Sequence, residues 1–119
     1  MYKAYGREGY FWGKSVAAGQ YIEIALEHLT DISRVVILSG SPRHLSDCFL
    51  DTELSVSRVQ YGGQCTGYRT VAQFVDSPTI DYRFNTTSPV SCIRLTLTKV
   101  KKHANGNSFW LFIREIALL

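Results

Sequence analysis

Apolar and polar residues alternate in short runs along this chain, and a period of two residues is typical of β-strands with one buried face. The clearest run is 91–100, where Ile93, Leu95 and Leu97 are apolar and the residues between them are polar. No stretch shows the period of a helix, so the pattern predicts an all-β sandwich of the jelly-roll type. About seven strands are expected from this spacing, over residues 20–26, 32–38, 52–59, 68–75, 79–85, 91–100 and 108–118.

The segments between these runs are polar or rich in glycine and proline. Residues 27–31 and 86–89 are therefore predicted to be turns, and residues 60–67 a glycine-rich connection. The last strand is apolar on both faces, which favours a position in the middle of a sheet. The aromatic run 10–12 either closes one end of the core or places one ring beside a ligand pocket.

With 119 residues, of which 45% are apolar and 19% charged, the chain is predicted to form one folded domain over residues 1–119. No segment approaches the roughly 20 apolar residues that cross a bilayer, so no direct membrane contact is expected. The first residues lack the apolar core of a signal peptide. We therefore expect either a cytosolic protein or a segment of a longer secreted or membrane-anchored one.

The formal net charge is only +3, and most basic residues are scattered singly, so no nucleic-acid partner is expected. Lys99, Lys101, Lys102 and His103 form the only basic cluster in the sequence. It is interpreted as a solvated hairpin tip, with contact to a phosphate or polyanion as the alternative.

The three cysteines contain no C-x-x-C pair, which excludes a zinc ribbon and a thioredoxin-type motif. In an oxidising compartment Cys65 is predicted to pair with Cys92 and to leave Cys48 free. In a reducing one all three would be buried thiols. Asn85 begins an N-x-[ST] sequon, which is compatible with a secretory setting.

The polar loop between the predicted strands 32–38 and 52–59 is the candidate site, because rigid strands position a surface loop for binding. Ser46 or Cys48 beside His44 and Asp47 offers the parts of a nucleophilic site, yet no framing motif accompanies them. No catalytic residues, metal ligands or cofactors are therefore predicted.

A carbohydrate site fits these residues better, because a sugar offers vicinal hydroxyls to a carboxylate and a C–H face to an aromatic ring. Asp47 is the predicted hydroxyl acceptor, with a turn-capping role as its alternative. The predicted donors are Arg43, His44 and the backbone amides of Ser39, Gly40 and Ser41. The predicted ring is Trp12, Tyr61 or Trp110, although Trp110 is also expected in the core.

Almost the whole chain resembles the C-terminal lectin-like domain of the N-acetylglucosaminyltransferase IV family, and more distantly discoidin and family-32 carbohydrate-binding modules. The segments that carry the resemblance are 10–12, 19–22, 39–40 with His44 and Asp47, 51–56, 93–95 and 110–116. The loop departs from the family's pattern at Arg43, where family members have an acidic residue.

The resemblance implies a galactose-binding-domain-like sandwich that binds terminal GlcNAc of N-glycans through Asp47, with His44 beside it. It implies that catalysis belongs to an upstream domain of the same chain, which makes the β1,4-GlcNAc branch. The expected location is the Golgi lumen, as part of a type II membrane protein, or the secreted fraction. The alternative is a protein-interaction or regulatory module that has lost sugar binding.

Overall fold

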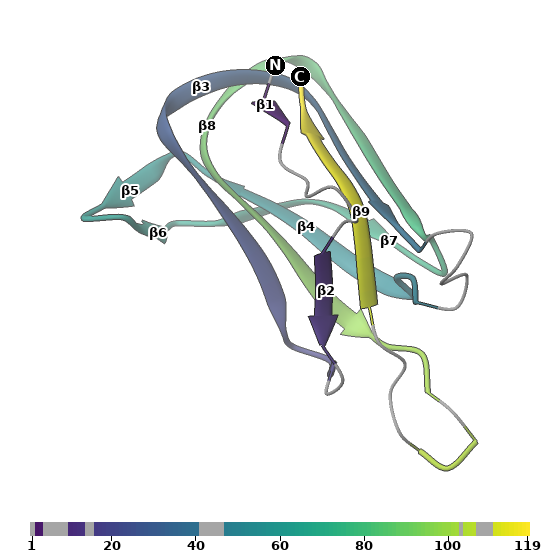
Figure 1. Cartoon of the computed structure of the whole chain (residues 1–119). Helices are drawn as coiled ribbons and strands as arrows, with labels where there is room; N and C mark the ends of the chain where they lie inside the picture. Colours follow the sequence, from purple (N-terminus) through teal and green to yellow (C-terminus); the bar gives the residue numbers. More distant parts are fainter. Residues whose placement is uncertain (1, 4–9, 14–15, 41–46, 103, 107–110) are drawn as a thin grey trace.

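In the computed structural model (Figure 1), all regular secondary structure of the described residues is β-strand. The structure describes residues 2–3, 10–13, 16–40, 47–102, 104–106 and 111–119, with only the backbone described for 2–3 and 10–13. No helix in these ranges could span a membrane. The strands are β1 (Tyr2–Lys3), β2 (Tyr10–Gly13), β3 (Tyr21–Ser39), β4 (Asp51–Ser57), β5 (Val59–Tyr61), β6 (Gln64–Thr66), β7 (Arg69–Phe74), β8 (Thr79–Lys99) and β9 (Leu111–Leu118).

The strands form two antiparallel layers, because the long strands β3 and β8 bend and contribute one half to each (Figure 1). In one layer β9 pairs with the second half of β3, through Val35 and Leu118, and with β1 and β2 on its other side. In the other layer the first half of β3 pairs with the second half of β8, followed by β4 and β7. The all-β sandwich is thus confirmed, and so is the internal position of the last strand.

Apolar side chains from both layers meet in one core. Ile37, Leu54, Ile80 and Leu95 are each fully buried and belong to the same cluster of contacting residues. In the second half of β8 the alternation correctly predicts that Ile93 and Leu97 are almost fully buried, like Leu95, although the adjacent Ser91 and Cys92 are buried as well. Burial of such side chains contributes about 1.5–3 kcal/mol each relative to exposure.

The predicted turns at 27–31 and 86–89 are wrong, because β3 and β8 continue through both segments. Thr30 pairs with Val90 and Asp31 with Pro89, and the register shifts between Ala25 and Thr30. The residues 27–31 are all exposed. These residues lie where the two strands cross from one layer to the other, outside the core. They therefore need no buried apolar side chain, and their composition resembles that of a turn.

The predicted connection 60–67 contains a hairpin instead, formed by β5 and β6 and projecting from the sandwich (Figure 1). Gly62 and Gly63 form its two-residue turn with φ values of 57° and 81°. Consecutive positive φ angles favour glycine and match the twist of a tight hairpin. A disulfide between Cys65 and Cys92 ties the hairpin to β8, which confirms the first of the two cysteine alternatives and leaves Cys48 free.

Candidate functional site

The candidate loop begins where β3 ends, at a buried serine. The Ser39 hydroxyl donates to the Pro78 carbonyl at 2.6 Å and accepts the Phe49 amide at 3.0 Å. The Phe49 side chain is itself buried in the core, with 1% of its surface exposed. One hydroxyl therefore ties the two ends of the loop to each other and to the segment before β8.

A residue of β9 bridges the same loop from the other side. The Phe112 carbonyl accepts the Gly40 amide at 2.8 Å, and the Phe112 amide donates to the Asp47 carbonyl at 2.9 Å. Gly40 has φ of 74°, a conformation that residues with a Cβ rarely adopt. Asp47 is half-buried at this bridge. The fold thus fixes the backbone of Asp47 to a central strand, while the rest of the loop connects the two held ends.

The backbone amides of Ser39 and Gly40 help to hold the candidate loop in place. The Ser39 amide donates to the Pro78 carbonyl at 3.1 Å, and the Gly40 amide is engaged with Phe112. Both amides, predicted as sugar donors, already have acceptors inside the protein. Their role in the described structure is to orient the loop on which Asp47 lies.

Tyr61 does not lie beside Asp47, contrary to the prediction. It belongs to the β5–β6 hairpin, and β4 runs between that hairpin and the candidate loop (Figure 1). Seven strand residues span about 20 Å, which is beyond the reach of one monosaccharide. The Tyr61 side chain is 75% exposed. It is therefore a separate surface feature and not the aromatic wall of a site at Asp47.

Four predicted site residues lie outside the described residues: Ser41, Arg43, His44 and Trp110. Ser46 also lies there, and only the backbone of Trp12 is described. That backbone belongs to β2, where Phe11 pairs with Phe112 and Gly13 with Leu111. Residue 12 is thus placed along the part of β9 that bridges the candidate loop, at the same end of the sandwich as Asp47.

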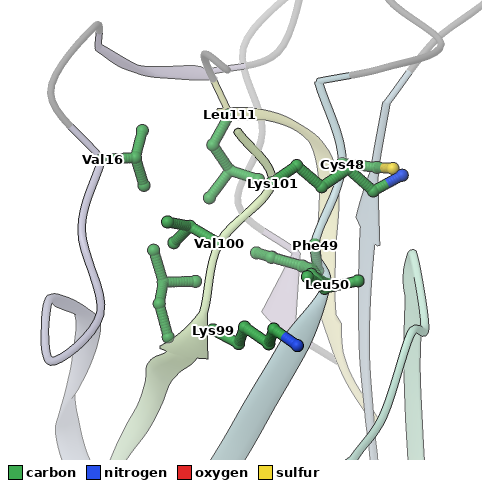
Figure 2. Close-up of a pocket in the computed structure, with 9 residues that line it drawn as sticks. Val16, Cys48, Phe49, Leu50, Lys99, Val100, Lys101 and Leu111 are labelled. Atoms are coloured by element: carbon green, nitrogen blue, oxygen red, sulfur yellow. The ribbon is translucent and has the colours of Figure 1, made fainter. Parts of the chain in front are cut away.

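A shallow hollow with a cavity volume of about 10 Å³ opens to solvent near the bridge (Figure 2). Cys48 and Leu111, the chain neighbours of Asp47 and Phe112, both line it. The Lys99 and Lys101 side chains extend toward the same side in Figure 2. The lining residues are Val16, Cys48, Phe49, Leu50, Leu97, Lys99, Val100, Lys101 and Leu111.

This hollow was not found from the sequence. Its basic residues stood out as a cluster, but the cluster was interpreted as a hairpin tip. The apolar floor comes from segments far apart in the chain, including Val16, Phe49 and Leu111. Because strand pairing brings these segments together, the basic cluster was the only local signal of the hollow.

A second polar group lies on the outer face of the β3–β8–β4–β7 layer. The Arg94 guanidinium carbon lies 4.0 Å from the Tyr21 ring centroid and 4.1 Å from that of Tyr68. Arg94 also forms an ion pair of 3.0 Å with Glu23, whose carboxylate accepts the Tyr68 hydroxyl at 2.7 Å. The cation, the carboxylate and the phenol contact one another, so the arrangement acts as a clasp between strands, although the buried Arg94 Nε has no hydrogen-bond partner among the described residues.

The electrostatics of this clasp follow from its hydrogen bonds. The Tyr68 hydroxyl, together with Arg94, lowers the pKa of Glu23 against the opposing effect of burial. Burial, followed by the bond to Glu23, raises the pKa of Tyr68. The carboxylate and the phenol therefore stay in their ordinary charge states at neutral pH. Neither is poised for acid–base chemistry, and the described residues contain no group of three metal-ligating side chains.

The fold and the loop together define a small antiparallel β-sandwich module that presents a tethered polar loop at one end. The sequence profile of the MGAT4 C-terminal domain matches residues 1–114, and the chain belongs to this family. This confirms the resemblance found in the sequence.

Three curated relatives are similar to the chain. An alpha-1,6-mannosyl-glycoprotein 4-beta-N-acetylglucosaminyltransferase of Gallus gallus is 32% identical over 98% of the chain and 25% of its own length. Two alpha-1,3-mannosyl-glycoprotein 4-beta-N-acetylglucosaminyltransferases, C of Sus scrofa and A of Gallus gallus, are each 27% identical. They match 98% and 96% of the chain, and 24% and 22% of their own lengths. The chain thus spans about a quarter of these glycosyltransferases.

Proposed function

We propose that this domain is a non-catalytic lectin domain that binds terminal GlcNAc of N-glycans through Asp47. It would assist a Golgi N-acetylglucosaminyltransferase, of which it forms the C-terminal part, in making the β1,4-GlcNAc branch. Membership of the MGAT4 C-terminal domain family supports this assignment, as do the names of the three glycosyltransferase relatives.

The observation that carries the proposal is the main-chain bridge at Asp47. Because the Phe112 amide donates to the Asp47 carbonyl at 2.9 Å, the main chain of Asp47 is held to β9. A carboxylate on a fixed main chain loses less conformational freedom when it binds two neighbouring hydroxyls than one on a chain that must first be ordered. The shallow hollow lined by the neighbouring Cys48 has apolar residues at its surface, which favours contact with the C–H face of a sugar.

A shallow site of this kind implies weak binding, and weak binding is sufficient for the proposed role. A tether to an upstream catalytic domain gives the glycan a high effective concentration once one module has bound it. The domain would then hold the parent enzyme close to its glycoprotein substrate or product. Catalysis itself is assigned to the part of the enzyme that lies outside this chain.

A second candidate function is a protein-interaction module, and the β5–β6 hairpin favours it. The hairpin is fixed to β8 by the Cys65–Cys92 disulfide, and Gln60 donates to the Leu26 carbonyl at 3.1 Å. It presents the exposed ring of Tyr61 on this rigid base. Exposed aromatic residues on a rigid element are typical of protein contacts.

NMR titration of the 119-residue chain with GlcNAc and with GlcNAcβ1-2Man tests the proposal. Asp47→Ala is expected to abolish the shift changes and to leave the remaining amide spectrum folded. Asp31→Ala is the matched control, because Asp31 is an exposed carboxylate at the bend of β3. Equal shift changes in wild type and Asp47→Ala would reject the site. A domain that binds no sugar but captures a glycosyltransferase through Tyr61 would support the second candidate.

A further inference from the structure

The hollow beside Asp47 carries two cations on one side. Lys99 is the last residue of β8, Lys101 follows it two positions on, and both side chains extend to the same side in Figure 2. Their backbones are about 7 Å apart, within one Debye length at physiological salt, so the two charges repel each other. Neither lysine takes part in an ion pair between described residues. An anion between them would relieve this repulsion.

The nearest acidic candidate on the paired strand does not fill this role. Asp51 lies opposite Lys99 in the β4–β8 ladder. Its carboxylate accepts the Asp76 amide at 2.9 Å, and Asp51 is not among the residues that line the hollow. The cationic side of the hollow therefore has no carboxylate partner in the described part of its lining.

The floor of the hollow is apolar, because Leu97, Val100 and Leu111 line it. The cavity volume of the hollow is about 10 Å³, which is enough for about one water molecule. A bound anionic group would therefore lie at the mouth of the hollow, beside the lysine side chains, and not inside it. Cations above an apolar floor match a ligand with an anionic group on a carbon skeleton.

We infer that this hollow is an anion subsite, which binds a carboxylate, sulfate or phosphate on the sugar at Asp47 or on its neighbour. The inference rests on the proposed function for the identity of the sugar, and on the lysines for the charge. Asp47 itself is not among the lining residues, but its chain neighbour Cys48 is, so the proposed subsite lies next to Asp47. The domain would thus prefer acidic glycans to neutral ones.

The test compares GlcNAc with GlcNAc 6-sulfate, GlcNAc 6-phosphate and the disaccharide glucuronic acid β1,3-GlcNAc, by NMR titration at low and physiological salt. Each exposed lysine contributes up to about fivefold in affinity, so the preferred acidic ligand is expected to bind about tenfold more tightly than GlcNAc at low salt. This advantage should shrink at physiological salt because the charges are screened. Lys99→Gln with Lys101→Gln should remove the preference and keep GlcNAc binding. Lys102→Gln is the matched control, since Lys102 is exposed and does not line the hollow.

Cys48 gives an independent readout, because it is the free thiol of the chain and lies in the hollow. A bound acidic ligand is expected to slow its alkylation by iodoacetamide, and the double lysine variant should lose this protection. The acidic derivative that protects Cys48 most strongly shows whether the preferred anionic group is a carboxylate, a sulfate or a phosphate.

Two failures are distinguishable. GlcNAc binding with no preference for any acidic derivative overturns the anion subsite and leaves the proposed function intact. If GlcNAc does not bind at all, the proposed function fails. Titration with inorganic sulfate and with inorganic phosphate then tests the anion subsite by itself. Shift changes at Lys99 and Lys101 that vanish in the double variant then support an anion site, and their absence overturns it.

Discussion

The hydroxyl of Ser39 accepts the amide of Phe49 at 3.0 Å across a loop of nine intervening residues, and both ends of this bond are buried. The same hydroxyl donates to the Pro78 carbonyl. A single side-chain oxygen therefore sets the separation of the two loop ends. The main-chain geometry at Asp47 therefore depends on a residue whose hydroxyl and amide are already engaged within the protein.

Ser39→Ala is expected to destabilise the domain and to weaken glycan binding. The variant leaves the buried Phe49 amide without its acceptor, which costs about 1–3 kcal/mol. Urea unfolding measures this loss. Ser33→Ala is the control, because its exposed hydroxyl donates to the Leu119 carbonyl and its removal should cost less than about 1 kcal/mol. Equal stability of the two variants would show that the loop ends are not held by Ser39.

Loss of the Cys65–Cys92 disulfide is expected to lower the free energy of unfolding by about 3.5 kcal/mol, from the chain entropy of a loop closed over 27 residues. The Cys65→Ala variant and the reduced wild type should both show this loss in denaturant unfolding. Cys48→Ala, which leaves the disulfide in place, should lose much less. Coincident unfolding of oxidised and reduced protein would contradict the prediction.

The ion pair of Glu23 predicts a pH-dependent contribution to stability. Because the folded state lowers the pKa of Glu23, the stabilisation is present above its unfolded pKa of about 4.3 and disappears as pH falls through the lower folded value. The Glu23 side chain is 30% exposed, so the contribution is below about 1 kcal/mol. Wild type minus Glu23→Gln, measured by urea unfolding, should show a difference at pH 7 that vanishes toward pH 2. A difference that is constant with pH would exclude the ion pair as its source.

Arg94→Lys is expected to cost about 1 kcal/mol although it preserves the charge. The ammonium group of lysine lacks the flat surface that lies between the Tyr21 and Tyr68 rings in the native structure. Thermal unfolding measures the loss. The control is Arg58→Lys at an exposed position, which should be close to neutral. A stability of Arg94→Lys equal to that of wild type would mean that charge alone holds the clasp.

The sequence predicted the parts of the fold in which side-chain alternation reflects burial. In β8 the buried Ile93, Leu95 and Leu97 follow a period of two, and the structure confirms it. The bends of β3 and β8 were missed because residues 27–31 are all exposed, although β3 continues through them and Thr30 and Asp31 are paired with β8. Strand pairing is a property of two segments, and one segment's composition does not report it.

The sequence indicates where the candidate loop lies along the chain but not what surrounds it. The loop with Asp47 was recognisable as polar sequence between two apolar strands. The bridge from Phe112 and the lysine-rimmed hollow arise from β9 and from the segment after β8, which are distant in sequence. The separation of Tyr61 from Asp47 likewise follows from the direction of β4, which the composition of the hairpin does not encode.

The most direct test of the central claim is an NMR shift map of the chain with GlcNAcβ1-2Man. The account predicts that the largest amide shifts fall at Asp47, Cys48 and Phe112, and that Asp47→Ala removes them while Asp31→Ala does not. Shifts confined to the β5–β6 hairpin, or a map that Asp47→Ala leaves unchanged, would contradict it.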